Sequence, residues 1–518
     1  MTPATAGPRL WAGFIAMSIG MFMAVLDIQI VASSLPEIQT AFAIPFDRLG
    51  WVQTAYLSFE IVAIPLTGWI TRTLSTRGAF VVAVLGFTAA SLACAVSPGF
   101  WWLISARLVQ GFFGGFLIPL VFSAVFLMFE DGPARVRATV IAGVLAMLAP
   151  TLGPSVGGFI TDRFSWHWLF LINVGPGIVV APLAGWMVAI DRRETGSGVD
   201  LASAPLLALF LAGMQVVLSE APRRGWGSPV MLGLMAVCVA CAAVAIRRCL
   251  TRPEPLVRLS AFRRRDFALG CAFSFSLGAG LYGATFLLPL YLGVVRHHDP
   301  FEIGLIMMVT GGAQLVAAPV ATILERRIEP RLLAGFGYAL LAVGLIGNAF
   351  MTPADDFWAL AWQQVVRGVS VMFCLLPTTS LALGAFPPGE ISNASGLFNL
   401  MRNLGGAIGL AVVDTLIEQR TPIHAAALIA RLQAGSRAAA AFVGLPLDQF
   451  NGQPLGPIDD ATRDQVAPLV EHAGLTMALN EAWLMLGAIV VVSLAALPWF
   501  GRATTPSNSR HSAAIRTE

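Results

Sequence analysis

The chain has 518 residues, of which 57% are hydrophobic and 12% are charged, whereas soluble proteins carry about 25% charged residues, so the composition indicates a polytopic membrane protein. All 32 basic residues are arginine, so no phosphate-binding Gly-Lys-Ser/Thr loop exists and direct ATP-driven pumping is not expected. The small net charge of +3 gives no support for nucleic-acid binding.

Apolar stretches recur along most of the chain. A helix needs about 20 apolar residues to cross the hydrocarbon core. Windows of this kind lie near 11–32, 49–70, 79–97, 101–127, 136–160, 168–190, 201–218, 229–249, 267–292, 301–323, 331–351, 357–383, 392–417 and 481–500. We therefore expect an all-α integral membrane protein with fourteen transmembrane helices. The first window lacks a small-residue cleavage site and is expected to stay in the mature protein.

The arginines are divided unevenly between the two sides of the predicted membrane. With both termini inside, twenty arginines fall on the inner side and nine on the outer side, while Arg107, Arg367 and Arg402 lie within helices. Four of the nine belong to the long segment 418–480, which the positive-inside rule discounts. The distribution predicts a multi-pass protein with both termini in the cytoplasm.

The first two windows each contain a carboxylate. Asp27 lies in Ala24-Val-Leu-Asp-Ile-Gln-Ile-Val31, and Glu60 lies near the centre of the second window. A carboxylate in the middle of a membrane costs roughly 3 kcal/mol and marks a functional site. Both residues are therefore candidates for proton coupling. The alternative for each is a fixed polar contact to a neighbouring helix.

The segment around Asp27 resembles the first-helix motif of the fourteen-helix drug:proton antiporters (EmrB/QacA type) of the major facilitator superfamily. Gln29 and Ala32 depart from the Thr and Asn that are usual there. In that family the acid is implicated in proton coupling. The resemblance implies the major facilitator fold, with two six-helix bundles plus two extra helices.

The connection between the second and third windows occupies the place of the superfamily's cytoplasmic gate motif. It reads Gly68-Trp-Ile-Thr-Arg-Thr-Leu-Ser-Thr-Arg77. Arg72 stands where an Asp is typical and Ser75 stands where Gly is typical, so the usual charge latch is in doubt. Gly68, Arg72 and Arg77 are the candidate gate residues, and Arg77 is placed to interact with the C-terminal dipole of a helix.

The fourth window carries Arg107-Leu-Val-Gln-Gly-Phe-Phe-Gly-Gly115, which resembles the family's fourth-helix motif. Counted from Trp101 at 1.5 Å per residue, Arg107 lies about 9 Å deep, a depth similar to that of Asp27. We expect the two to be neighbours, so that protonation of Asp27 leaves Arg107 unpaired and favours a shift of packing. The alternative is a static ion pair. Gln110 is expected to line the substrate cavity.

The fifth window has a small residue at every fourth position from Ala149 to Gly157. Such a flat helix face lets a second helix approach closely, and the prolines within it permit bending. The window resembles the antiporter signature of exporters of the superfamily, which implies efflux. It matches that signature at Gly153, Pro154, Gly157 and Gly158. The opening of the next window, from Trp166 to Asn173, is also similar to the fourteen-helix branch.

A weak internal repeat relates the two halves of the chain. Thr151–Gly157 aligns with Asn403–Gly409, and Val109-Gln-Gly aligns with Val366-Arg-Gly. Both matches pair corresponding windows of two parallel six-helix halves. The expected domains are an N-terminal six-helix bundle (1–195), two additional transmembrane helices (196–250), a cytoplasmic linker (251–265), a C-terminal six-helix bundle (266–503) with a long extracytoplasmic loop (418–480), and a disordered tail (504–518).

The thirteenth window resembles the family's penultimate helix and carries a polar face. Asn399, Arg402 and Asn403 follow i, i+3 and i+4, so they share one side of a helix. We expect this face to line the cavity or the interface between the halves. Gln314 is a further candidate for the cavity, with an ordinary helix-to-helix hydrogen bond as its alternative.

These features lead to one functional expectation: proton-coupled efflux of amphipathic drugs or toxic compounds across the cytoplasmic (inner) membrane by alternating access. The proton gradient supplies the energy, with no cofactor. The expected partners are amphipathic small molecules, protons, membrane lipids and, by family analogy, a periplasmic adaptor protein at 418–480.

Other functions fit the sequence less well. A proton-coupled importer of a small solute and a lipid flippase of similar fold are the alternatives, and the antiporter signature argues against import. An enzyme is not expected, because the predicted helices contain no paired His or Ser/His/Asp set. The six histidines show no metal-ligand spacing, so no metal site is expected.

Overall fold

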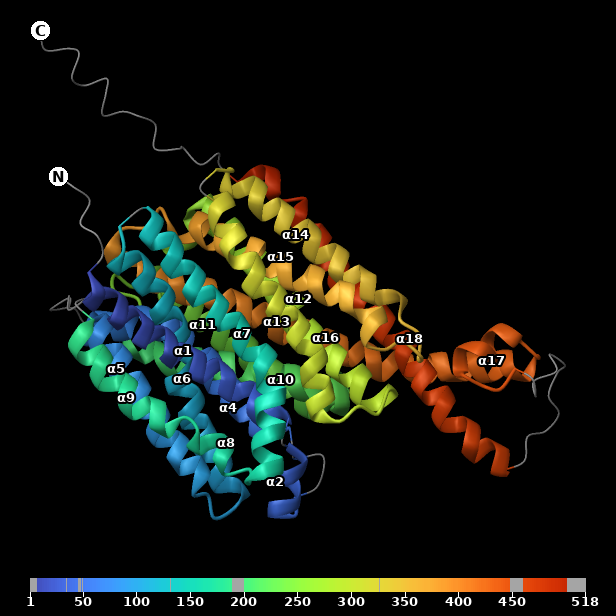
Figure 1. Cartoon of the computed structure of the whole chain (residues 1–518). Coiled ribbons are helices and arrows are strands. Elements are labelled where there is room, and N and C mark those ends of the chain that lie inside the picture. The colour runs from blue at the N-terminus through green and yellow to red at the C-terminus, as the bar shows by residue number, and fades with distance from the viewer. Residues whose placement is uncertain are drawn as a thin grey trace, which may run out of the picture.

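A computed structural model describes residues 7–33, 35–44, 48, 50–130, 132–188, 200–325, 327–447 and 460–500. Within these ranges all regular elements are helices. Figure 1 shows most of them lying side by side in one elongated bundle. We call the end of the bundle at which α1 (Pro8–Ser33) begins the terminal end, and the opposite end the far end.

The first half of the bundle follows the predicted windows closely. After α1 and the short α2 (Leu35–Phe42), its helices are α4 (Trp51–Ala63), η1 (Ile64–Leu66), α5 (Thr67–Ala95), α6 (Phe100–Met128), α7 (Pro133–Arg163), α8 (Trp168–Leu171) and α9 (Val174–Met187). The run Trp51–Ala95 crosses the bundle twice, because the backbone leaves helical geometry at Ser75 (φ 68°, ψ 165°). That conformation favours glycine, which explains why Gly is usual at this position.

Two additional helices and the second half complete the bundle. The additional pair is α10 (Ala204–Arg224) and α11 (Pro229–Thr251). The second half contains η3 (Leu259–Arg263), α12 (Arg265–Leu290) with the π-helical turn η4 (Tyr291–Val295), α13 (Pro300–Glu325), α14 (Pro330–Gly347), α15 (Phe357–Leu383), α16 (Pro388–Gln433), α17 (Arg437–Val443) and α18 (Asp460–Leu494).

The number of membrane crossings agrees with the sequence. Twelve helical runs in the described ranges are long and apolar enough to span a membrane. One of them is the double crossing Trp51–Ala95, and α7, with 31 residues, spans the bundle between α1 and α13. The described chain therefore makes fourteen crossings, which confirms the expected all-helical, multi-pass architecture.

The segment 418–480 contains more helix than a long loop would. α16 continues unbroken for 46 residues to Gln433, α17 follows, and α18 begins at Asp460. These parts form a projection at the far end of the bundle (Figure 1). Leu428, Ala440 and Ala473 belong to a small apolar core that holds the projection together. The predicted boundary at 195/196 and the tail 504–518 lie outside the described residues.

The two halves meet near the terminal end. Ser395 of α16 donates a hydrogen bond to the Pro119 carbonyl of α6, at 2.9 Å. A Cβ atom on Gly396 would lie 2.8 Å from the Ile64 carbonyl oxygen of η1. The halves therefore touch backbone to backbone at this end, and the structure is closed there.

The additional helix α10 contacts both halves on one side of the bundle. Ser219 of α10 and Thr54 of α4 share a hydrogen bond of 3.2 Å between their hydroxyl groups. Trp226, which follows α10, donates from Nε1 to the Thr415 hydroxyl of α16 at 2.9 Å. The extra pair is thus attached to each half near the far end.

Candidate functional site

A fully buried ion pair joins α1 to α6. Arg107 Nη1 lies 2.5 Å from Asp27 Oδ2, and neither side chain has any exposed surface. This contact confirms the predicted proximity of the two residues. The guanidinium also donates through Nε to the Val52 carbonyl of α4 at 3.2 Å and lies 4.4 Å from the centre of the Tyr56 ring.

Two neutral side chains complete the shell around Asp27, and a third, Ser91, binds one of them. Asn173 donates to Oδ1 at 2.7 Å and Gln110 donates to the same oxygen at 3.0 Å. Gln110 also accepts from Arg107 at 2.7 Å and donates to Ser91 at 2.8 Å. Gln110, which was expected to line the substrate cavity, is therefore engaged within the ion-pair cluster.

Asn173 is a site residue that the sequence reasoning did not single out. It lies in the turn between α8 and α9, and its position in the segment that opens the sixth window was the only signal. A buried carboxylate needs donors to replace water, so an amide on the facing helix was the residue type to look for. With it, the Asp27 cluster draws on α1, α5, α6 and the α8–α9 turn.

Glycines on α6 place Arg107 against its neighbours. A Cβ on Gly111 would lie 2.1 Å from the Tyr56 carbonyl oxygen, and one on Gly115 would lie 2.5 Å from the Glu60 carbonyl oxygen. Both distances are far below van der Waals contact. Only glycine allows α6 to pack this closely on α4, which brings the arginine to the level of Asp27.

Glu60 is the second buried carboxylate of this half, but its surroundings differ from those of Asp27. Its side chain is 4% exposed, and it forms none of the ion pairs or hydrogen bonds found among the described residues. It interacts electrostatically with Arg107 and with Arg402 of the second half. Glu60 thus lies between the Asp27 cluster and the interface of the two halves.

The polar face of α16 lies near the interface of the halves, because the Arg402 guanidinium is 5.7 Å from the centre of the Phe122 ring of α6. Arg402 is 3% exposed and donates to the Asn399 side-chain oxygen. Asn403 accepts from the Tyr282 hydroxyl of α12 at 3.1 Å. Gln314 of α13 is buried, and its side-chain oxygen makes no hydrogen bond within the described structure.

The fifth-helix signature lies where α7 touches α1. A Cβ on Gly153 would lie 2.2 Å from Cβ of Gln29, two residues after Asp27. Gly157 and Gly158 are buried on the same helix. Pro154 continues the helix, and its side-chain surroundings lie outside the described part. The flat face of α7 therefore packs directly against the helix that carries the acid.

Two of the candidate gate residues, Gly68 and Arg72, contact the second half and the linker that leads to it. A Cβ on Gly68 would lie 2.9 Å from Cβ of Asn393 on α16. Arg72 donates to the Pro255 and Leu256 carbonyls at 3.5 and 3.4 Å. Arg77 is half-buried. Arg72, which replaces the acid of the usual motif, thus binds backbone carbonyls of the linker between the halves.

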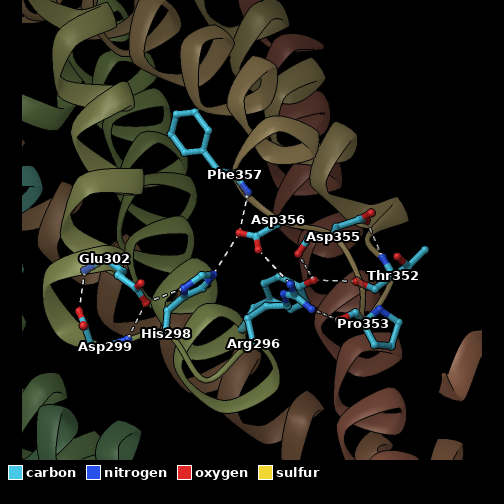
Figure 2. A network of polar contacts seen from close by, with 10 residues as sticks. Arg296, His298, Asp299, Glu302, Thr352, Pro353, Asp355, Asp356 and Phe357 are labelled. Atoms are coloured by element: carbon cyan, nitrogen blue, oxygen red, sulfur yellow. Dashed lines mark hydrogen bonds and ion pairs between the residues drawn. The ribbon is translucent and has the colours of Figure 1, made fainter.

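A polar cluster at the far end of the second half was not predicted. Figure 2 shows it joining the η4–α13 connection to the residues before α15. Arg296 binds Asp356 at 2.9 Å, and His298 bridges Asp356 and Glu302 at 3.0 and 2.8 Å. The hydrogen bond from Arg296 lowers the pKa of Asp356 to about 2, and the bond to Glu302 raises the pKa of His298.

The sequence and structure comparisons identify the class of protein. Residues 17–410 match the Major Facilitator Superfamily, so the chain belongs to that superfamily. The solved structure of the proton:xylose symporter XylE has the same fold, with a TM-score of 0.61 at 13% identity over 96% of both chains.

Curated relatives define the branch. The chain is 38% identical to the colistin resistance protein EmrB of Acinetobacter baumannii over 80% of this chain and 81% of that protein. It is 30% identical to the multidrug export protein EmrB of Escherichia coli over 96% of each chain. The chain is thus a member of the drug:proton antiporter branch of the EmrB type.

Proposed function

We propose that this protein exports amphipathic drugs or toxic compounds from the cytoplasm in exchange for protons. The observation that carries the proposal is the Asp27–Arg107 pair, an ionisable couple enclosed by four helical elements of a transporter fold. Residues of this kind inside a membrane bundle mark proton relays. The names of the two EmrB relatives support export of toxic compounds.

Proton binding changes the contacts of Arg107 in a defined way. While Asp27 is ionised the pair is neutral and joins α1 to α6. When Asp27 takes a proton, Arg107 keeps Gln110 and the Val52 carbonyl as partners but loses its countercharge. An uncompensated buried cation is strongly unfavourable, so a rearrangement of α1 against α6 and α7 becomes favourable. Alternating access follows if this rearrangement opens the closed terminal end.

The proton gradient supplies enough energy for such a cycle without a cofactor. Moving one proton inward releases about 2.3 kcal/mol per 100 mV, which corresponds to a concentration ratio of roughly 50 for the exported compound. Glu60, which is buried beside the interface of the halves, is proposed as a second protonation site. We also propose that both termini lie in the cytoplasm and that the α16–α18 projection meets a periplasmic adaptor.

The test is transport in inverted membrane vesicles with an imposed pH gradient and a panel of cationic, neutral and anionic dyes. Wild-type vesicles are expected to accumulate dyes only with the gradient, and Asp27→Asn is expected to reduce this to the level of empty vesicles. Immunoblotting of the membranes controls for insertion. Absence of gradient-dependent accumulation of every dye in wild type overturns the proposal, and normal transport by Asp27→Asn removes Asp27 from the mechanism.

Sidedness and the adaptor need separate measurements. A protease-cleavable tag at either terminus is expected to be cut in inverted vesicles and protected in intact cells. Cross-linking from residues introduced on α17 is expected to capture a periplasmic protein in the native host. Cleavage in intact cells would reverse the proposed orientation.

A further inference from the structure

The linker between the halves is buried at the closed terminal end. Leu256 is 1% exposed and Val257 is 3% exposed, and both side chains belong to the main apolar core of the bundle. A connection that only joined two bundles would run over the surface. We call residues 254–258 the clasp segment, because both halves hold it.

The second half binds the main chain of the clasp segment through one side-chain amide. Asn393 of α16 accepts a hydrogen bond from the Arg258 N–H and donates one to the Arg258 carbonyl, both at 3.0 Å. An asparagine amide presents a donor and an acceptor side by side, so it can pair with both main-chain groups of one residue. Because Asn393 is only 8% exposed, removing its amide is costly for these main-chain groups.

The first half holds the same segment through α5. Arg72 donates to the Pro255 and Leu256 carbonyls at 3.5 and 3.4 Å. One turn earlier on α5, Gly68 leaves room for Asn393, since a Cβ on this glycine would lie 2.9 Å from the Asn393 Cβ. Contacts from opposite halves therefore fall on neighbouring residues of the clasp segment.

The start of the clasp segment is anchored as well. The Glu254 carbonyl accepts a hydrogen bond from the Asp200 N–H at 3.1 Å, and Asp200 is ion-paired with Arg248 of α11. Pro253 and Pro255 fix φ near −65°, which lowers the conformational entropy that is lost when the segment is ordered. The additional helices thus hold one end of a stiff segment whose other end is bound by the two halves.

We propose that the clasp segment is a latch that stabilises the closed terminal end, in place of the usual charge latch of the gate motif. Opening this end moves α5 away from α16, so Arg72 and Asn393 cannot both keep their contacts with the segment. Each opening therefore breaks one set of hydrogen bonds and loosens the burial of Leu256 and Val257. The linker then sets the balance between the closed and open states as well as joining the halves.

Three thiols can report the events of this proposal separately. Cys249 at the end of α11 interacts with the Val257 backbone, so its reaction with N-ethylmaleimide reports release of the clasp segment. Ser395→Cys places a thiol where the halves touch, because Ser395 is fully buried and binds the Pro119 carbonyl of α6; its reaction reports opening of the terminal end. Cys94, fully buried near the other end of α5, reports unfolding.

The test measures the labelling rates of these thiols by peptide mass spectrometry on purified full-length protein in lipid nanodiscs. Every protein carries Ser395→Cys. Asn393→Leu removes both hydrogen bonds to Arg258 with little change in side-chain volume. We expect labelling at Cys249 and at position 395 to rise about tenfold while Cys94 stays protected, as the loss of these hydrogen bonds predicts. Because no substrate and no proton gradient are needed, the outcome is independent of the proposed export function.

A second variant addresses the contact from the first half. Arg72→Met keeps the apolar stem of the arginine and removes its hydrogen bonds to the clasp segment. We expect a smaller rise at both reporting positions, because the hydrogen bonds of Arg72 are longer than those of Asn393. If Asn393→Leu also exposes Cys94 and so unfolds the protein, Arg72→Met decides by the same criteria.

Asn480→Leu is the matched control. The Asn480 amide also donates to a main-chain carbonyl, that of Met351 at 2.8 Å, but it does so within the second half and away from the clasp segment. Its labelling rates are expected to equal those of the parent. A rise at position 395 without one at Cys249 would show that Asn393 acts only through its packing against Gly68. A rise at Cys249 alone would show that release of the segment does not open the end. Either result, no change at both positions, or equal rises in Asn480→Leu overturns the proposal.

Discussion

The two six-helix halves carry the same pair of polar residues in opposite order. On α6, Arg107 is followed three residues later by Gln110, and on α15, Gln364 is followed three residues later by Arg367. In each pair the arginine Nη1 donates to the glutamine side-chain oxygen, at 2.7 Å in the first half and 2.9 Å in the second. The hydrogen-bonded pair is thus repeated in the second half, but there the arginine lies one helical turn after the glutamine instead of one turn before it.

The packing around these pairs is repeated as well. The residue after each pair is glycine, and a Cβ there would lie 2.1 Å from the Tyr56 carbonyl oxygen for Gly111 and 2.3 Å from the Thr310 carbonyl oxygen for Gly368. Four residues beyond Tyr56 the chain has Glu60, and four beyond Thr310 it has Gln314. The repeated contact therefore places a carboxylate in one half opposite an amide in the other.

The difference between the halves lies in their acids. Asp27 and Glu60 both belong to the first half, and none of the buried carboxylates in the described ranges belongs to the second. Arg367 has only an amide and the Trp483 ring, 5.4 Å away, as polar or aromatic partners in the contacts described. The helix packing is the same in both halves, whereas the buried carboxylates that we propose exchange protons belong to the first half alone.

Replacing Arg107 and Arg367 in turn tests this difference most strongly. Arg107→Met leaves Asp27 buried without a countercharge, so we expect the free energy of unfolding to fall by about 3–5 kcal/mol. Arg367→Met strands no carboxylate and is expected to be neutral or stabilising by up to about 1 kcal/mol. Thermal unfolding in one detergent, followed by intrinsic fluorescence, compares the two. If both variants lost the same free energy of unfolding, the effect of Arg107→Met could not be attributed to the unpaired Asp27 carboxylate.

Alanine at the repeated glycines tests the shared packing. Gly111→Ala and Gly368→Ala each force a methyl group into a backbone carbonyl, and we expect each to cost about 1–3 kcal/mol. Gly312→Ala on α13 is the control, because a Cβ there meets no atom within 4 Å; better helix propensity should make it stabilising by up to about 1 kcal/mol. The same unfolding assay applies. If alanine were tolerated at only one of the two sites, the close helix packing would not be equivalent in the two halves.

The smallest effect is expected at the polar cluster of the second half, which is in contact with water. The pKa of His298 is raised from 6.5, first by its bond to Glu302 and then by Asp356. Its stabilisation is therefore complete below about pH 6.5 and is lost as the pH rises through the raised value. Because Glu302 and Asp356 are about half exposed, we expect only about 0.5 kcal/mol.

The measurement is the melting temperature of wild type and His298→Gln between about pH 5.5 and 8.5, a range that brackets the usual histidine pKa. The difference between the two proteins should shrink as the pH rises. Arg296, Asp299 and Asp355 lie around His298 and are present in both proteins, so the difference between the two proteins isolates the contribution of His298. A constant difference would show that His298 acts through packing alone.

Much of the fold could be predicted because membrane-spanning helices are recognised in a sequence as apolar stretches of about 20 residues. All fourteen crossings coincide with apolar windows, and equal depth along the helices was enough to bring Asp27 and Arg107 together. The ends of α16 and α18 could not be placed in the same way, since both helices continue beyond the apolar windows into polar, alanine-rich sequence. Alanine favours helix without hydrophobicity, and a hydropathy window does not record that.

The site was harder to predict in its details. Periodicity placed Asn399, Arg402 and Asn403 on one face, but it could not tell which donor would be left without a partner. Gln110 was expected to line the substrate cavity, yet its amide group binds Asp27 and Arg107. Asn173 and the His298 cluster depend on contacts between segments far apart in sequence, and no single helix pattern carries that information.

The hydrogen bonds of α10 give the transporter a strap along one edge. Ser219 is hydrogen-bonded to α4, and Trp226, just beyond α10, is hydrogen-bonded to α16. The halves therefore cannot separate on this edge near the far end unless these hydrogen bonds break or α10 moves with one of the halves. At the opposite edge α7 of the first half packs directly against α13 of the second. The hydrogen bonds of α10 therefore favour a rocking motion that pivots on the edge where α10 lies.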